Sequence, residues 1–195
     1  CALSALKEVL SRTVPALVLS IGYAGGLDLR LKVGDIVVAD KVLEIDQSAT
    51  FSKSYLVNPQ QPDLFGRLTS QNKIMIYKGT LLTVNQVISD SSAKQELGSS
   101  HKALAVDMET SSLIGHCIEK QIPFVSVRAI SDTMEQSLIN TSSFVDGEGK
   151  VSKIKAGWFA ATHPHAIKNL ISLRSQSQKA TANLTEILGV FLRTL

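Results

Sequence analysis

Residues 16–26 read ALVLSIGYAGG, an apolar run, Ala16–Ile21, followed by a glycine-rich end that starts at Gly22. A short apolar run bounded by a glycine is typical of a strand buried on both faces of a sheet. Pro15 separates this strand from Ala2–Leu10, where the apolar residues have helical spacing. The stretch therefore predicts a helix followed by an internal strand.

The rest of the chain continues this alternation of strands and helices. Expected strands cover 35–39, 42–45, 73–84, 101–106 and 124–130, and residues 54–57 are expected to be partly extended. Expected helices cover 63–70, 89–97, 108–119 and most of 151–195, with a break near Pro164, whereas 23–34, 47–62 and 131–150 are expected to be loops. This order predicts a single α/β domain over residues 1–195, with a parallel or mixed central sheet.

Composition excludes several classes of protein. Hydrophobic residues make up 44% and charged residues 19% of 195 residues, which is ordinary for a folded globular chain. Lys+Arg is 20 against Asp+Glu 17, and this weak positive balance without a basic stripe does not favour nucleic-acid binding. Apolar runs are far shorter than the roughly 18 residues of a membrane-spanning helix.

Cys1 and Cys117 suggest no disulfide framework, and no signal peptide is visible, so we expect a cytoplasmic protein.

Three strand ends carry residues that suit ligand binding, because ligands of open α/β sheets bind beyond the carboxyl ends of strands. The first is 22–26, GYAGG, where glycines allow close approach of the backbone to a ligand. It matches neither a P-loop nor a dinucleotide fingerprint, and an ordinary tight turn is the alternative.

The other two strand ends carry carboxylates. Asp107 and Glu109 enter a predicted helix, where Asp107 suits either helix capping or function, and Glu109 suits a bidentate grip on vicinal hydroxyls. Asp132, after Ser131, ends a buried strand and suits either an Asx turn or a general acid. The four histidines have no metal-ligand spacing, so no metal and no cofactor are expected.

Taken together, SIGYAGGLDLRLKVGDIVVADKV (20–42), AVDMET (105–110) and PFVSVRAISD (123–132) resemble the nucleoside phosphorylase and nucleosidase superfamily. This superfamily includes purine nucleoside phosphorylases and methylthioadenosine/S-adenosylhomocysteine nucleosidases. A looser resemblance of AVDMETSSLIG, DGEGK and the segment that starts HPHAIKNL points to its hopanoid-associated phosphorylase branch, which is linked to removing adenine from adenosylhopane.

The resemblance implies a three-layer α/β/α fold with a central mixed sheet, and cleavage of the N-glycosidic bond of an adenine nucleoside. It implies that Asp132 assists protonation of N7 of the departing purine, with Ser131 beside it. Glu109 would hold the ribose hydroxyls, with Met108 against the sugar. The base would lie at Val87 and Ile88, and Ala24 and Gly25 would line the side of the sugar and nucleophile.

The nucleophile is expected to be water rather than phosphate. Phosphorylases of the superfamily usually have an arginine and a hydroxyl residue where this chain has Ser20 and Tyr23. An anion site without the bidentate arginine is weak, so phosphate would be a co-substrate only in a phosphorylase. The first strands of the superfamily, with the glutamate that positions water, would precede residue 1, so we expect an N-terminally truncated chain.

Several alternatives remain open at this point. The enzyme could be a methylthioadenosine-type nucleosidase, a purine nucleoside phosphorylase, or, in another class, a non-catalytic nucleoside-binding module. Members of the superfamily are commonly dimers or hexamers, so a homo-oligomer is expected. Residues 151–179 combine lysines and arginine with Trp158 and Phe159, which suits either peripheral contact with the inner membrane surface or a helix that covers the sheet.

Overall fold

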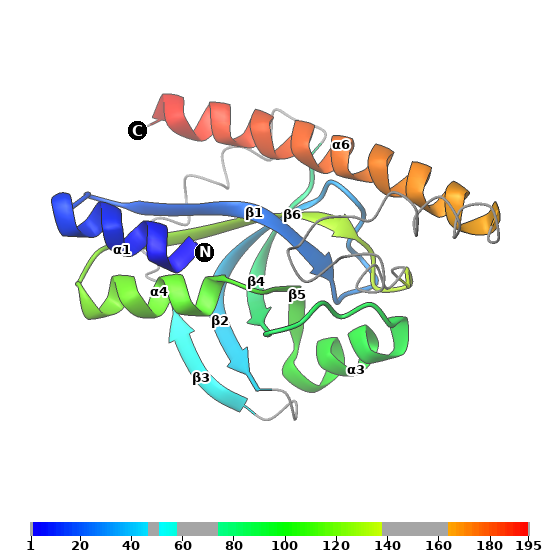
Figure 1. The fold of residues 1–195 in the computed structure, drawn as a ribbon, viewed down its shortest axis with the longest axis horizontal. Coiled ribbons are helices and arrows are strands. Elements are labelled where there is room, and N and C mark those ends of the chain that lie inside the picture. The colour runs from blue at the N-terminus through cyan, green and yellow to red at the C-terminus, as the bar shows by residue number, and fades with distance from the viewer. Residues whose placement is uncertain (1, 47–50, 58–73, 138–163, 195) are drawn as a thin grey trace, which may run out of the picture.

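The computed structural model describes residues 2–46, 51–57, 74–137 and 164–194 (Figure 1). The strands are β1 (Val18–Gly26), β2 (Ile36–Ile45), β3 (Phe51–Leu56), β4 (Ile76–Thr83), β5 (Ala103–Asp107) and β6 (Phe124–Asp132). The helices are α1 (Ala2–Arg12), α3 (Ser91–His101), α4 (Thr110–Glu119) and α6 (Pro164–Thr194).

The six described strands form one mixed sheet in the order β3-β2-β4-β5-β1-β6. β1 and β6 are parallel, as are β2 with β4 and β4 with β5, whereas β1 meets β5 antiparallel. Residues 36–38 of β2 also pair with 127–129 of β6, so the sheet curls back on itself. The predicted α/β fold with a mixed sheet is confirmed.

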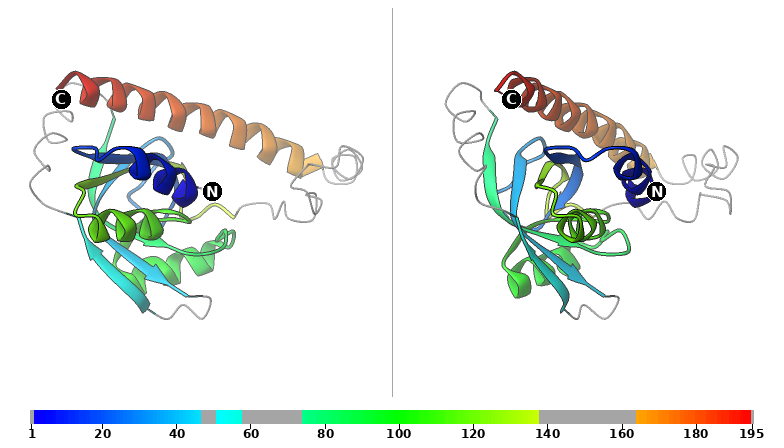
Figure 2. Two further views of the ribbon diagram at one scale, coloured as in Figure 1. Left: turned by 60° about the vertical axis from the view of Figure 1, so that its left-hand side comes forward. Right: turned by 90° about the vertical axis from the view of Figure 1, so that its left-hand side faces the viewer.

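Helices cover both faces of this sheet, which gives the three predicted layers. On β4, Ile76 contacts the cluster under α6 and Leu82 contacts the cluster under α3, whereas Leu81 faces α4. This alternation is the two-residue period of a strand buried on both sides. Figures 1 and 2 show α6 lying along the sheet on the side away from α1 and α4.

Several strand boundaries differ from the prediction: β3 begins at Phe51, β5 begins at Ala103 and not at 101, and β6 continues to Asp132. β1 continues through the glycines to Gly26, because residues 18–25 pair with β6 and Gly25 and Gly26 also pair with β5. The two short strands expected at 35–39 and 42–45 are one strand, β2, with an irregularity between Ala39 and Lys41. The helix expected at 63–70, residues 151–163 and the loop beyond 137 lie outside the described residues.

Two features define where α3 begins and how closely it packs on the residue that follows β1. Its N-cap, Asp90, accepts a hydrogen bond from the backbone N–H of Ala93 at 2.9 Å. Hydrogen bonds from Ser92 and from that N–H hold the pKa of Asp90 below its usual value. Near the other end, a Cβ atom on Gly98 would lie 2.1 Å from the carbonyl oxygen of Leu27, so only glycine lets α3 approach this closely.

Replacing Gly98 by Ala is therefore expected to destabilise the protein by about 1–3 kcal/mol, because α3 has to move off Leu27. The free energy of unfolding in urea measures this loss. Gly189→Ala in α6 is the matched control, since its Cβ meets nothing within 4 Å. Alanine is the better helix former by about 1 kcal/mol, so the control is expected to be neutral or stabilising. Equal stabilities for Gly98→Ala and the wild type would contradict the close packing.

Candidate active site

The candidate site lies where four strands end. Gly25 of β1 pairs with Val106 of β5 on one side and with Asp132 of β6 on the other. Thr83 of β4 pairs with Asp107 of β5. Because parallel neighbours end together and β5 meets the end of β1, the three predicted strand ends converge at one place, as expected for ligand sites in α/β sheets.

A cavity of about 360 Å³ opens at this place. Its wall contains all eight residues predicted from the sequence: Ala24, Gly25, Val87, Ile88, Met108, Glu109, Ser131 and Asp132. Tyr23 and Gln86 also line it, and the sequence had not indicated Gln86 as a site residue. The structure thus brings together residues that are more than 100 positions apart in the chain.

Asp132 is held at the floor of this cavity by hydrogen bonds to both carboxylate oxygens. Its side chain is almost completely buried, and Oδ1 accepts a hydrogen bond from the Ser131 hydroxyl at 2.6 Å. Oδ2 lies 2.5 Å from Nζ of Lys94, in a buried ion pair. A Cβ on Gly25 would lie 3.2 Å from Oδ2, so a side chain at this position would press on the carboxylate. These contacts replace the Asx turn that was the alternative for Asp132.

Glu109 and Met108 form the wall at the start of α4. Glu109 is the N-cap residue of α4, yet its side chain makes no capping hydrogen bond. Both side chains are exposed at the cavity. A carboxylate at a helix N-terminus interacts favourably with the helix dipole, and its two oxygens can accept hydrogen bonds. The position suits a residue that receives hydroxyl groups of a ligand.

Asp107 also lines the cavity, and both of its carboxylate oxygens make contacts inside the protein. Oδ1 accepts from the backbone N–H of Thr110, at 3.3 Å, and from the hydroxyl of Thr83, at 2.9 Å. Oδ2 accepts from the Thr110 hydroxyl and, at 2.9 Å, from Nε of Arg128. The capping interpretation of Asp107 therefore describes its contacts, and the buried ion pair with Arg128 extends them.

Arg128 is the centre of a buried polar network that sequence reasoning missed. Its guanidinium donates to Oγ and to the carbonyl of Ser20, at 2.9 and 3.0 Å, and to the hydroxyl of Thr110 at 2.6 Å. Only 3% of this residue is exposed. An arginine inside an otherwise apolar strand, 124–130, was the available signal, because buried charges in strands require partners.

Lys94 is the second residue that sequence reasoning missed. It lies on the buried side of α3 with Leu97 and Gly98, which are three and four positions further on. A lysine at the position of an apolar residue on a helix was the only signal, and such a lysine is usually at the solvated edge.

The charges around the cavity indicate whether it could hold an anion such as phosphate. Among the described residues, no lysine or arginine lines the cavity. Ser20 is buried and bonded to Arg128, and the hydroxyl of Tyr23 makes a 2.6 Å hydrogen bond with Thr181 of α6. Both positions that phosphorylases use for an anion are thus occupied with contacts inside the protein. No group of three potential metal ligands occurs in the described part of the chain.

The class of protein follows from the fold, the site and a family comparison together. Residues 1–158 match the family model described as the phosphorylase superfamily, and the chain belongs to this superfamily.

Individual relatives are nucleosidases. A 5′-methylthioadenosine/S-adenosylhomocysteine nucleosidase of Staphylococcus aureus is 29% identical over 136 residues, covering 64% of this chain. The chain spans 60% of the length of that relative. Among solved structures, the nucleosidase of the same name from Neisseria meningitidis, in complex with methylthio-immucillin-A, has a TM-score of 0.72 at 18% identity, covering 100% of this chain and 76% of that one. Futalosine hydrolase of Helicobacter pylori has a TM-score of 0.69 at 18% identity, covering 100% and 73%.

Proposed function

We propose that this protein cleaves the N-glycosidic bond of an adenine nucleoside with water and releases adenine. The observation that carries this proposal is the meeting of Asp132 and Glu109 in one cavity at the converging strand ends. A volume of about 360 Å³ lies within the range of roughly 300–1,000 Å³ that is typical of small-molecule sites. The nucleosidase relatives support the same reaction class.

The proposed mechanism assigns the leaving group to Asp132. As the C1′–N9 bond breaks, its electron pair passes into the purine, and a proton from Asp132 to N7 neutralises the charge that develops there. General acids of this kind contribute roughly 10²–10⁴-fold to rates. Ser131 fixes the carboxyl group through its 2.6 Å hydrogen bond.

The sugar and the base are assigned to the other walls. The carboxylate of Glu109 would accept hydrogen bonds from the ribose 2′- and 3′-hydroxyls, which holds C1′ in a reactive orientation. Met108 would pack against the sugar and Val87 and Ile88 against the base, with Ala24 and Gly25 on the side from which water approaches. A cavity wall without lysine or arginine in the described residues favours water over phosphate as nucleophile.

For the 5′-substituent we favour the small thioether groups on which the nucleosidase relatives act by name. Adenosylhopane is the second candidate and rests on the looser resemblance of segments between 105 and 184. Most of the segment 151–179, which was also the basis for membrane contact, lies outside the described side chains. Among the described helices, none is both long and apolar enough to cross a bilayer. A homo-oligomer stays the expectation from the resemblance, and a cytoplasmic location stays the expectation from the sequence.

The test is adenine release by the full-length gene product, with and without phosphate. Substrates are 5′-methylthioadenosine, S-adenosylhomocysteine and an adenosine with a long 5′-alkyl group. Release that does not require phosphate is the expected result. Preference for the alkyl substrate would favour adenosylhopane as the natural substrate. Strict dependence on phosphate would overturn hydrolysis. Binding without release from any substrate would favour a non-catalytic nucleoside-binding module.

A further inference from the structure

The most unusual charged group of the described chain is Lys94, whose side chain is 0% exposed. Burying an ammonium group is costly unless it is paired with an opposite charge and fully hydrogen-bonded. Lys94 lies in α3, behind the cavity wall and not in it. Its contacts therefore show which groups compensate the cost of burying this charge.

All three N–H groups of the Lys94 ammonium have an acceptor. They donate to Oδ2 of Asp132 at 2.5 Å, to the carbonyl of Gln136 at 2.8 Å and to the carbonyl of Thr133 at 3.1 Å. An ammonium group has three donors, so its hydrogen-bonding capacity is fully used. One of the three partners is the residue proposed as the general acid.

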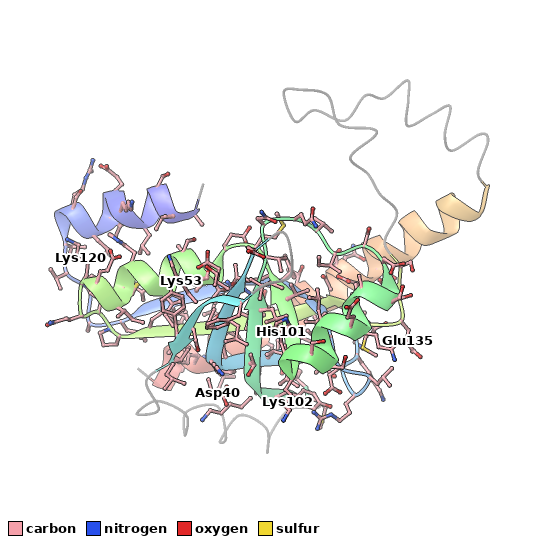
Figure 3. The ribbon with its side chains drawn as sticks, turned by 90° about the horizontal axis from the view of Figure 1, so that it is seen from below. Asp40, Lys53, His101, Lys102, Lys120 and Glu135 are labelled. Atoms are coloured by element: carbon pink, nitrogen blue, oxygen red, sulfur yellow. The ribbon has the colours of Figure 1, made fainter. Side chains whose placement is uncertain are left out.

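These contacts join α3 to the turn that follows β6. Ser137, beyond that turn, also lies 3.5 Å from Ser91 at the start of α3, Oγ to Oγ. Figure 3 shows Glu135 of this turn near one end of α3 and Lys102 at the other end. Asp132 is part of the cavity wall and Lys94 is not, so the ammonium group contacts this carboxyl group from outside the cavity.

We propose that Lys94 is a positioning residue for the proposed glycosidic cleavage, acting on the charge that forms on Asp132. This inference rests on the proposed function. When Asp132 protonates N7, its O–H bond breaks and an N7–H bond forms, while the C1′–N9 electron pair stays on the purine. A carboxylate remains at Asp132, and it is the species that a fixed ammonium 2.5 Å away stabilises. The ion pair between Lys94 and Asp132 is the arrangement that this proton transfer would produce. Water forms the new C1′–O bond, and the proton that it loses balances the one that restores the acid form of Asp132.

A purely structural lysine would do something different. It would fix the turn 133–136 and support the cavity for every substrate alike. A positioning residue for the acid matters only where the leaving group needs a proton. The two roles can therefore be distinguished by whether the effect of replacing Lys94 depends on the leaving group.

The experiment compares Lys94→Met with wild type in the full-length gene product on two substrates. One is 5′-methylthioadenosine, whose adenine needs protonation. The other is the p-nitrophenyl riboside with the same 5′-group, whose phenolate leaves without a proton. We expect kcat for adenine release to fall roughly 10²-fold, the scale of losing one preorganised electrostatic contact. Nitrophenol release is expected to change less than about threefold, because no proton is transferred to that leaving group.

Lys7→Met, on the exposed surface of α1, is the matched control and is expected to leave both rates unchanged. Equal losses on both substrates for Lys94→Met, or no loss on either, would overturn the positioning role. A wild-type protein that releases neither product would overturn the proposed function and this inference with it.

A second comparison covers the case in which Lys94→Met does not fold because Asp132 is left as an unpaired buried charge. The double variant Lys94→Met/Asp132→Asn removes both charges and is compared with Asp132→Asn alone. Residues that act through one another give strongly non-additive effects. We expect both variants to release adenine at the same residual rate. A further tenfold loss in the double variant would show that Lys94 acts independently of Asp132 and would contradict the proposal.

Discussion

Replacing Asp132 by Asn is expected to slow adenine release roughly 10²–10⁴-fold, because an amide cannot donate the proton that the departing purine needs. The amide keeps the size of the carboxyl group, and its oxygen can still accept a hydrogen bond from Lys94. Nucleoside binding is therefore expected to survive. The measurements are kcat for 5′-methylthioadenosine and, by calorimetry, the Kd of an adenine nucleoside analogue that cannot be hydrolysed, on the wild type and the variant.

Asp28→Asn is the matched control for this substitution. Asp28 pairs with Arg30 at 2.8 Å outside the cavity, and hydrogen bonds from Arg30 hold its pKa below the usual value. We expect its kcat to stay within about twofold of wild type, since an exposed pair contributes roughly 0–1 kcal/mol even to stability. Unchanged turnover in Asp132→Asn would remove Asp132 from the mechanism.

Replacing Arg128 by Met is expected to destabilise the protein by about 3–5 kcal/mol, the typical cost of removing one partner of a buried ion pair. Asp107 would lose its charged partner at 2.9 Å, and Ser20 would lose two hydrogen bonds. Urea denaturation of the variant and wild type measures the loss. Arg12→Met removes an exposed pair with Glu8 in α1 and is expected to cost at most about 0.5 kcal/mol.

The double variant Arg128→Met/Asp107→Asn tests the reason for this effect. If the cost arises from an unpaired buried charge, neutralising Asp107 recovers part of the stability lost in Arg128→Met. A double variant that is less stable than Arg128→Met by the full effect of Asp107→Asn would instead show that the two residues act independently. A loss below about 1 kcal/mol in Arg128→Met would contradict the role of the network altogether.

The order of helices and strands could be predicted from the sequence because burial imposes clear periods on it. The run at 124–130 forms a strand buried on both faces, as its composition predicts. The run before Gly22 also forms a strand, but over residues 18–21 only Ser20 is buried and Ile21 is 45% exposed, so the burial expected there was wrong. The end of β1 was predicted too early. Glycines normally indicate a turn, but here Gly25 and Gly26 pair with neighbours that come much later in the chain, and local sequence carries no signal of those neighbours.

The residues of the site divide in the same way. Glu109, Ser131 and Asp132 could be predicted because polar groups at strand ends are conspicuous and match known motifs. The role of Lys94 could not be predicted, because it depends on contact with Asp132, which lies 38 positions further along the chain. That contact forms only when α3 packs against the end of β6. Arg128 was visible as a charge in an apolar strand, yet its partners Ser20 and Thr110 come from two other elements. The roles of Lys94 and Arg128 therefore depend on tertiary contacts, which the local sequence pattern does not contain.

The pairing of Gly25 with both Val106 and Asp132 has a consequence for the order of folding. Its partners lie roughly a hundred residues further along the chain, so the entropy of closing two long loops has to be overcome before they meet. Contacts of such high sequence separation form slowly compared with helices such as α4. The cavity is therefore expected to form late in folding, and recovery of ligand binding after dilution from denaturant is expected to follow completion of the sheet.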